Sequence, residues 1–280
     1  MNIQERIFRA ATGRVEAEHV SIRLGRGSTA AEAVSDVSFE VFPGEFVCLL
    51  GPSGCGKSTL LGALAGHIEP VAGKLSVDRV PVKGPHPERG IVFQHHTLFP
   101  WKNARDNVAF GPKMRGVTRS QRRLEAERML ELVGLNGFAD RYPFQLSGGM
   151  QQRVEIARVL INQPKLLLMD EPFGALDALT RLMLQELLLE IWEQFRKTIV
   201  FVTHDIDEAI LLADRIIIMQ AQPGRIREEF NVPFERPRTT EIIASGEFMR
   251  LKQHCLRLLH SDRRGDILAR LSPLGYSTTI

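Results

Sequence analysis

The chain has 280 residues, of which 44% are hydrophobic and 25% are charged, as in an ordinary globular protein with a sizeable core. Its formal net charge of +3 is too small to indicate a nucleic-acid-binding protein. No apolar run approaches the roughly 18 residues of a membrane span. We expect no signal peptide, because the opening segment MNIQERIFRAATG has no apolar centre. Three cysteines without zinc-ligand spacing predict a reducing, cytoplasmic environment.

The charge is unevenly distributed along the chain. Residues 236–280 carry eight Arg and Lys against four Asp and Glu, so this tail has a net charge of +4 and the remainder −1. A basic tail either faces a membrane surface or is a solvated terminal face, and we favour the second interpretation.

The first third of the chain predicts mainly strands. Alternating and continuous apolar residues place them at 15–24, 34–42, 46–50 and 90–94, with a strand-and-turn region at 73–89. Directly after the apolar run FVCLL, the glycine-rich segment GPSGCGKST (51–59) leads into a helix that we expect from Lys57 to about Gly66.

The middle of the chain predicts helices instead. Thr118 as an N-cap, a charged face and Gly134 as a stop delimit one helix. The segment MQQRVEIARVLINQ (150–163) predicts a second helix, which Pro164 ends. Residues 95–162 are therefore expected to form a helical insertion.

Strands and helices alternate again after this insertion. The strands are expected at 165–170, 198–203 and 215–220, with a helix at 178–196. Nearly continuous apolar strands separated by helices are typical of a mostly parallel sheet covered on both faces, so the fold class is α/β. One further helix is expected in the tail, with a core-packing stripe of Phe248, Leu251, Cys255 and Leu258.

The segment 51–59 is suited to binding the phosphates of a nucleoside triphosphate. It follows a strand and opens a helix, so that backbone N–H groups and the positive end of the helix dipole point to one place. The spacing from Gly51 to Gly56, followed by Lys57 and Ser58, matches the phosphate-loop pattern.

The strand LLLMD is followed at once by a second carboxylate, giving the pair Asp170 and Glu171. At the carboxyl edge of the sheet, Asp170 can hold Mg²⁺ through water, with the Ser58 hydroxyl as a direct ligand. Glu171 can orient the attacking water or accept its proton. The alternative is a structural cap or ion pair, which the complete phosphate loop disfavours.

The segment LSGGMQQR (146–153) combines a Ser-Gly-Gly turn with the start of a helix and predicts a second anion site. Since the glycine loop already binds the phosphates, a second such element indicates two copies that meet head to tail, each closing over the other's ATP. The alternative is a plain Schellman-like turn.

Together these motifs resemble those of the ATP-binding subunits of ABC transporters, over about residues 15–235. By this resemblance GPSGCGKST is the Walker A loop, LLLMDE the Walker B strand and LSGGM the signature. Gln94 in VFQHH is similar to the Q-loop glutamine, Asp177 in GALD to the D-loop aspartate, and His204 in VTHD to the switch histidine.

The resemblance implies a P-loop NTPase fold of the ABC ATPase type, with a mostly parallel core sheet and an antiparallel β region. It places an ABC ATPase domain at 1–235, made of a RecA-like core (15–94 and 163–235) and a helical subdomain at about 95–162, before the tail at 236–280.

The same resemblance implies ATP and Mg²⁺ as ligands. The expected catalytic residues are Glu171, His204, Gln94 and Lys57, and the expected metal ligands are Ser58, Gln94 and Asp170. The residues expected to bind the nucleotide are Gly51, Pro52, Ser53, Gly54, Cys55, Gly56, Lys57, Ser58, Thr59, Ser147, Gly148, Gly149 and Asp177.

One position departs from the family pattern. An aromatic residue in the first strand region usually stacks on adenine, but the matching residue here is Leu24. We therefore expect weaker stacking on the base, with ATP as the default nucleotide.

The run GPHPERGIVFQ…FPWKNARDNVAFG is most similar to the nitrate, sulfonate and taurine import group, taurine closest. Within it, Phe99, Pro100 and Trp101 predict an exposed anchor for a membrane partner. The alternative is that Trp101 packs into the insertion's own core.

This resemblance predicts an ATPase that energises uptake of taurine or alkanesulfonate-like anions, or alternatively of nitrate or another small solute. It implies as partners a second copy of the chain, integral membrane permease subunits and, indirectly, a substrate-binding protein. It also implies a location at the cytoplasmic face of the inner membrane and no nucleic-acid partner.

A soluble ABC-type ATPase acting on nucleic acid is the first alternative, but only 53 residues separate Gln94 from Ser147, too few for long arms. A nucleotide-binding module without turnover is the second, which Glu171 and His204 argue against.

Overall fold

The computed structural model describes residues 12–25, 31–95 and 97–271, with side chains through residue 259. Most of the segment for which we expect no signal peptide therefore lies outside the described residues. The strands are β1 (Val15–Leu24), β2 (Ala31–Val41), β3 (Phe46–Leu50), β4 (Ala72–Val77), β5 (Val80–Pro81), β6 (Arg89–Val92), β7 (Leu166–Asp170), β8 (Thr198–Thr203), β9 (Arg215–Gln220) and β10 (Arg225–Asn231). The helices are α1 (Lys57–Ala65), α2 (Ala104–Val108), α3 (Phe110–Met114), α4 (Arg119–Leu132), α5 (Gly148–Leu160), α6 (Ala178–Phe195), α7 (Ile206–Leu212) and α8 (Gly246–Leu271).

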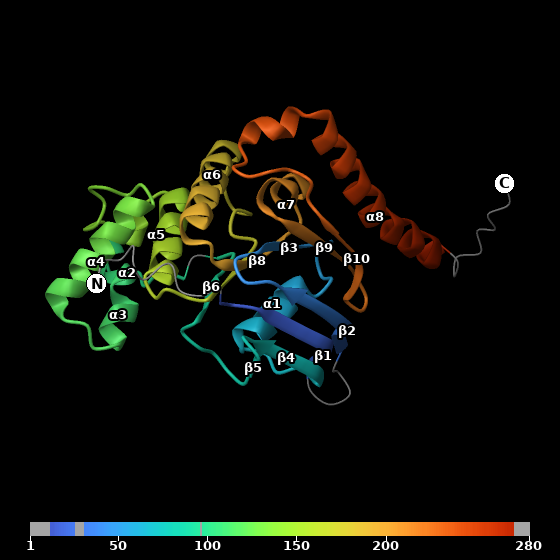
Figure 1. The fold of residues 1–280 in the computed structure, drawn as a ribbon, viewed down its shortest axis with the longest axis horizontal. Helices are drawn as coiled ribbons and strands as arrows, with labels where there is room; N and C mark the ends of the chain where they lie inside the picture. Colours follow the sequence, from blue (N-terminus) through green and yellow to red (C-terminus); the bar gives the residue numbers. More distant parts are fainter. Residues whose placement is uncertain (1–11, 26–30, 96, 272–280) are drawn as a thin grey trace.

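A six-stranded sheet with the order β10-β9-β3-β8-β7-β6 forms the centre of the molecule (Figure 1). Its strands are parallel except β10, which pairs antiparallel with β9 at the edge. The mostly parallel sheet is thus confirmed. The strand β10 was not predicted, because RIREEFN is short of apolar residues and lies half-exposed at an edge.

Both faces of this sheet are buried, as the apolar strands predict. In β3, Phe46, Cys48 and Leu50 pack into one hydrophobic cluster, while Val47 and Leu49 pack into another. Because side chains alternate along a strand, the two clusters lie on opposite faces. Helices α6 and α7 cover the first face, and α1 lies against the second (Figure 1).

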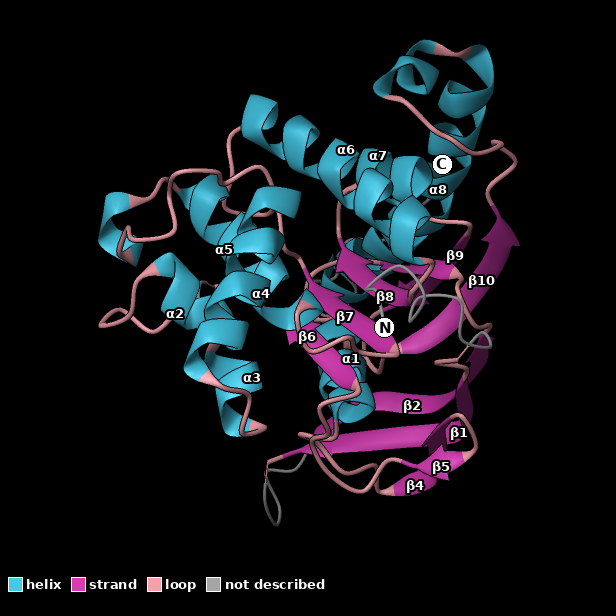
Figure 2. Ribbon diagram, turned by 60° about the vertical axis from the view of Figure 1, so that its left-hand side comes forward, coloured by secondary structure: helices cyan, strands magenta, loops and turns pink. Residues whose placement is uncertain are grey.

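A second, four-stranded sheet in the order β2-β1-β4-β5 is antiparallel throughout. It lies on the far side of α1, which is therefore sandwiched between the two sheets (Figures 1 and 2). This arrangement confirms the predicted antiparallel β region and fixes the start of α1 at the carboxyl edge of the central sheet.

Helices α2 to α5 gather at one end of the molecule (Figure 2). Helix α4 begins after Thr118, whose hydroxyl accepts a hydrogen bond from the Gln121 N–H. Helix α5 begins at Gly148 rather than at the predicted residue 150, because Ser147 is its N-cap and the first helical N–H groups need no intrahelical partner. It ends at Leu160, since Pro164 disfavours helical geometry in the residues before it.

The tail forms α8, which packs against α7 and β9. Phe248 and Cys255 are fully buried, and Leu251 and Leu258 pack against the same cluster, so the predicted stripe is core packing. Among the described residues, no helix combines the length and apolar character that crossing a membrane requires.

Candidate nucleotide-binding site

The phosphate loop connects β3 to α1, as predicted. Gly54 and Gly56 have φ values of +81° and +88°, a left-handed conformation that glycine adopts without strain. A Cβ at Gly56 would lie 2.6 Å from the carbonyl oxygen of Ala33, so only glycine fits this close backbone approach. The loop therefore brings several backbone N–H groups to the N-terminus of α1, a suitable place for an anion.

Lys57, the first residue of α1, is 4% exposed and extends back along the loop. Its Nζ donates hydrogen bonds to the carbonyl oxygens of Gly51 (2.8 Å) and Pro52 (2.9 Å). A buried cation thus lies inside the loop. Burial also raises the pKa of the Cys55 thiol, against the opposing effect of Lys57, so this cysteine stays protonated at neutral pH.

Ser58 and Asp170 meet at the end of the loop, although 112 positions separate them in the chain. The Ser58 hydroxyl donates to Asp170 Oδ1 at 2.8 Å. Partial burial raises the pKa of the Asp170 carboxyl, an effect that the Ser58 hydrogen bond opposes. A hydroxyl and a carboxylate are hard oxygen donors, and Mg²⁺ is usually held by one or two carboxylates plus phosphate oxygens, so these residues fit Mg²⁺. No group of three His, Cys, Asp or Glu that would suit another metal occurs in the described part of the chain.

Glu171 and His204 form the next pair. Strands β7 and β8 are parallel neighbours, so their carboxyl ends bring these two residues together. His204 Nδ1 lies 2.9 Å from Glu171 Oε2, and the Glu171 N–H donates to the Val202 carbonyl oxygen at 2.9 Å. Glu171 has a φ of +42°, in the left-handed region. Its carboxylate contacts His204, whereas that of Asp170 contacts Ser58.

Gln94 reaches the same turn from the end of β6. A Cβ built on Gly174 would lie 3.6 Å from Gln94 Nε2 and 3.8 Å from Glu171 Oε2. The amide and the carboxylate thus flank one glycine. Gln94 is exposed, two residues beyond the strand, where the helical region begins.

Asp177 and Ser147 are both helix N-caps. The Asp177 carboxylate accepts a hydrogen bond from the Thr180 N–H (3.0 Å), which lowers its pKa, and the structure therefore places it at the start of α6 rather than in a free turn. The Ser147 hydroxyl accepts from the Met150 N–H. The Ser-Gly-Gly sequence opens a helix of 13 residues, so the Schellman-like alternative is wrong.

A hollow lies beside Ser147. Its lining residues are Gly134, Leu135, Phe138, Ser147, Gly149, Met150, Arg153, Thr180 and Met183. All of them come from the helical region or from α6, none from the phosphate loop, and exposed Leu179 and Met183 continue this surface along α6.

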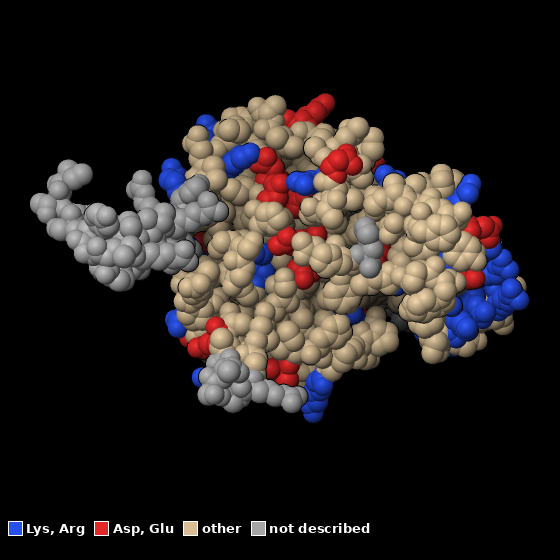
Figure 3. Space-filling view, turned by 180° about the vertical axis from the view of Figure 1, so that it is seen from behind, with Lys and Arg blue, Asp and Glu red and all other residues tan. Residues whose placement is uncertain are grey.

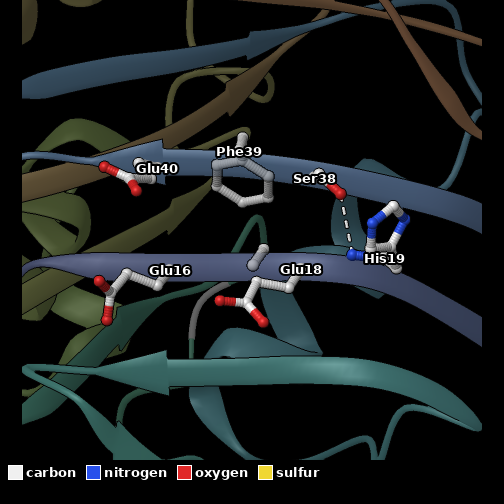
Figure 4. Close-up of a pocket in the computed structure, with 7 residues that line it drawn as sticks. Glu16, Glu18, His19, Ser38, Phe39 and Glu40 are labelled. Atoms are coloured by element: carbon white, nitrogen blue, oxygen red, sulfur yellow. Dashed lines mark hydrogen bonds between the residues drawn. The ribbon is translucent and has the colours of Figure 1, made fainter.

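Another hollow lies on the antiparallel sheet and has the wrong charge for phosphates. Figure 4 shows Glu16, Glu18 and Glu40 along it, with the His19 N–H donating to the Ser38 hydroxyl at 2.8 Å. Arg14 pairs with Glu16 and Glu40, and Lys74 with Glu18, so three carboxylates against two cations leave this hollow net negative. Of these two places, the phosphate loop is therefore the one suited to a nucleotide.

One contact near the site was missed at the sequence level. Arg181 in α6 donates to Asp205 Oδ2 at 3.2 Å, and Asp205 in turn caps α7. This pair connects the helix after Asp177 with the residue after His204. The N-cap signal at Asp205 was present in the sequence, but its partner depends on the packing of α6 against α7.

Comparison with known proteins agrees with this geometry. The family model described as ABC transporter matches residues 34–174. An uncharacterized ABC transporter ATP-binding protein of Methanocaldococcus jannaschii is 48% identical over 231 residues, which cover 82% of this chain and 85% of that protein. The taurine import ATP-binding protein TauB of Ruegeria pomeroyi is 47% identical over 219 residues, covering 78% of this chain and 81% of that protein.

A solved structure has the same fold. It is the dimeric, post-hydrolysis state of an ATP-binding cassette bound to ADP and Pi, which is 33% identical with a TM-score of 0.69 and covers 79% of this chain and 100% of its own. Since the family model spans half of the chain and these relatives match most of it, the chain belongs to the ABC transporter family of ATP-binding proteins.

Proposed function

We propose that this chain is the ATP-hydrolysing subunit of an importer for taurine or a related small sulfonate, working with a separate membrane permease. The observation that carries the ATPase assignment is the convergence of Lys57, Ser58–Asp170 and Glu171–His204 at one edge of the central sheet. Phosphoryl transfer to water needs positioning and charge stabilisation, which this set of residues supplies.

Each residue has a distinct role in the proposed reaction. The loop N–H groups and Lys57 bind the phosphates of ATP, and Lys57 exchanges its carbonyl partners for phosphate oxygens. Ser58, Asp170 and Gln94 hold Mg²⁺, which supplies charge neutralisation when bound. Glu171 orients the attacking water and accepts its proton, while His204 holds Glu171 and contacts the terminal phosphate.

The second copy completes the site in this proposal. The hollow beside Ser147 has no lining residue from the chain's own phosphate loop. In this proposal the helix N-terminus at Ser147 and Gly148–Gly149 therefore binds the nucleotide of a partner copy, with Asp177 at the seam. The dimeric state of the related cassette supports this arrangement.

Cross-linking tests the shared nucleotide directly. The three native cysteines are buried, whereas Ser53 and Ser147 are exposed. In the double variant Ser53→Cys/Ser147→Cys, we expect an intermolecular disulfide with ATP and Mg²⁺ but not with ADP. Absence of that disulfide in the ATP state would contradict the head-to-tail dimer, and either single variant is the control.

Trp101 supports the permease as a partner. Its side chain is 70% exposed, so the alternative in which it packs into the core of the helical region is wrong. Its ring packs against that of Phe99 (centroids 5.6 Å apart), which gives an aromatic anchor seven residues after Gln94 in the chain. A contact there can move Gln94 and so couple the permease to hydrolysis at the inner membrane face.

The substrate class rests on the relatives. Several taurine import ATP-binding proteins are 47–50% identical to this chain. Uptake of labelled taurine, alkanesulfonates and nitrate in a strain that lacks this gene, with and without the gene restored, tests the assignment. Restored nitrate uptake with no effect on taurine would replace taurine by the alternative substrate.

The described helical region disfavours action on nucleic acid. Its longest helix, α4, has 14 residues, far too short for the coiled-coil arms expected of a soluble ABC-type ATPase that organises or repairs DNA.

A further inference from the structure

A dense group of positive side chains lies at the end of the molecule formed by the helical region (Figure 3). The chain carries Lys113, Arg115, Arg119, Arg122 and Arg123 in this stretch, with no Asp or Glu between Asp106 and Glu125. We call these five residues the basic patch. Its charge of +5 exceeds the +3 of the whole chain, so the rest of the protein is net negative.

The charges of the basic patch are not neutralised within the described residues. Lys113, Arg115 and Arg119 are exposed, and none of the five forms an ion pair with a described residue. Arg122 donates to the Val117 carbonyl oxygen at 3.1 Å, which leaves its charge uncompensated. By contrast, the nearby Arg105 is buried and paired with Glu127 and Asp140. The patch is therefore different from the structural arginines of the same region.

Apolar side chains lie among these cations. Met114 is 69% exposed at the end of α3, and Leu124 is 50% exposed on α4. Exposed apolar groups between basic residues are typical of surfaces that contact lipid headgroups, where the apolar groups enter the acyl boundary. The phosphate backbone of a nucleic acid offers no partner for Met114 or Leu124.

The position of the patch fits the same occupant. Phe110, the first residue of α3, packs against Phe99 with ring centroids 4.7 Å apart and the rings tilted, and Phe99 contacts Trp101. Helix α3 has five residues and so spans only about 8 Å. In the proposed function, on which this inference rests, Trp101 docks on a permease. The patch then lies next to the membrane in which the permease is embedded.

We propose that the basic patch binds anionic lipid headgroups of that membrane. The cations are spread over two helices and the turn between them, which suits the diffuse negative potential of a bilayer surface. This contact would add to the permease contact and orient the helical region toward the bilayer, with an attraction that salt screens.

Vesicle co-sedimentation of the full chain tests the proposal. We compare phosphatidylcholine vesicles with vesicles of mixed phosphatidylcholine and phosphatidylglycerol. The variant Lys113→Gln/Arg119→Gln/Arg123→Gln removes three charges for which no side-chain contact is observed. The control Lys74→Gln/Arg79→Gln/Lys83→Gln removes three exposed charges on or beside the antiparallel sheet. Both variants should keep the basal ATPase activity, which separates a failure here from a failure of the proposed function.

We expect the wild type and the control to bind only the anionic vesicles, and about 1 M salt to abolish binding. Since each cation near an anionic surface contributes about fivefold, the patch variant should bind more than about a hundredfold more weakly. Equal binding of wild type and patch variant would overturn the proposal. A loss of permease affinity by the patch variant in nanodiscs of phosphatidylcholine alone would also overturn it, because the patch would then contact the permease itself. Preferential binding to double-stranded DNA over anionic vesicles would overturn it as well.

Discussion

His204 Nδ1 and Glu171 Oε2 lie 2.9 Å apart, at the carboxyl ends of two neighbouring parallel strands. The imidazole is exposed, whereas the carboxylate is largely covered, with 16% of its side chain accessible. Glu171 is thus held by His204 on one side and lies near Gln94 on the other. This arrangement positions a carboxylate without pairing it to a permanent cation.

The substitution Glu171→Gln should keep ATP binding and lower turnover by about 10²- to 10⁴-fold, because the amide cannot accept the proton of water. Phosphate release measures turnover, and the mass of the protein in solution with ATP reports the trapped dimer. Glu247→Gln, an exposed glutamate on α8, is the matched control. A monomeric Glu171→Gln variant with full activity would contradict the role assigned to Glu171.

The substitution Asp170→Asn should stabilise the chain without Mg²⁺ while abolishing Mg²⁺-dependent hydrolysis. Burial raises the Asp170 pKa in the folded state, so the folded chain keeps this proton to higher pH than the unfolded chain. The free energy of unfolding therefore falls as pH rises from 3.8, the ordinary pKa of the carboxyl, through its raised pKa in the folded state. This destabilisation persists at neutral pH.

Thermal melting from acid to neutral pH, in the absence of Mg²⁺, measures this effect. The difference between variant and wild type should be near zero in acid and should grow with pH. A constant difference, or a variant that melts below the wild type at neutral pH, would show that burial of Asp170 does not carry this cost.

The substitution Trp101→Ala should leave the ATPase activity of the isolated chain within about twofold and uncouple it from a reconstituted transporter. Removing an exposed aromatic anchor typically costs about 2 kcal/mol of binding free energy, or about 30-fold in affinity. Phe42→Ala, at a side chain that is 52% exposed directly after β2, is the control. Unchanged coupling would remove Trp101 from the interface.

The substitution Leu24→Tyr should lower the KM for ATP. Leu24 ends β1 and is 43% exposed, so an aromatic ring at this position has room to stack on a base. Stacking contributes about 0.5–1.5 kcal/mol, which corresponds to about two- to twelvefold in affinity. Leu24→Ala should change the KM little, and a similar KM for all three proteins would place adenine elsewhere.

The substitution Arg238→Met should destabilise the protein by about 3 kcal/mol, because it leaves several buried carbonyl oxygens without a donor. Arg238 is 6% exposed and donates to Phe234 O, to Ile210 O in α7 and to the carbonyl oxygen of Ala213, the C-cap residue of α7. Burial lowers its pKa to about 10, so it remains charged at neutral pH. Chemical denaturation measures the change, with exposed Arg250→Met as a control that should unfold like the wild type.

Local sequence patterns predict those parts of the site that consist of residues close together in the chain. The phosphate loop is contiguous, so its glycines, Lys57 and its place between β3 and α1 follow from spacing and backbone geometry alone. The cap roles of Asp177 and Ser147 are equally local, because each side chain accepts a hydrogen bond from the N–H three residues later. The short helices α2, α3 and α7 and the edge strand β10 were not predicted, because helices of five to seven residues and a half-exposed strand carry little periodic signal.

The sequence by itself determined most of the long strands and helices, the phosphate loop and the family, because each of these depends on residues that are close together along the chain. Tertiary structure alone decided that Ser58 meets Asp170 and that His204 meets Glu171. These pairs join distant parts of the chain, and the order of strands in a sheet, which brings their ends together, arises from packing of the two hydrophobic clusters rather than from any local preference.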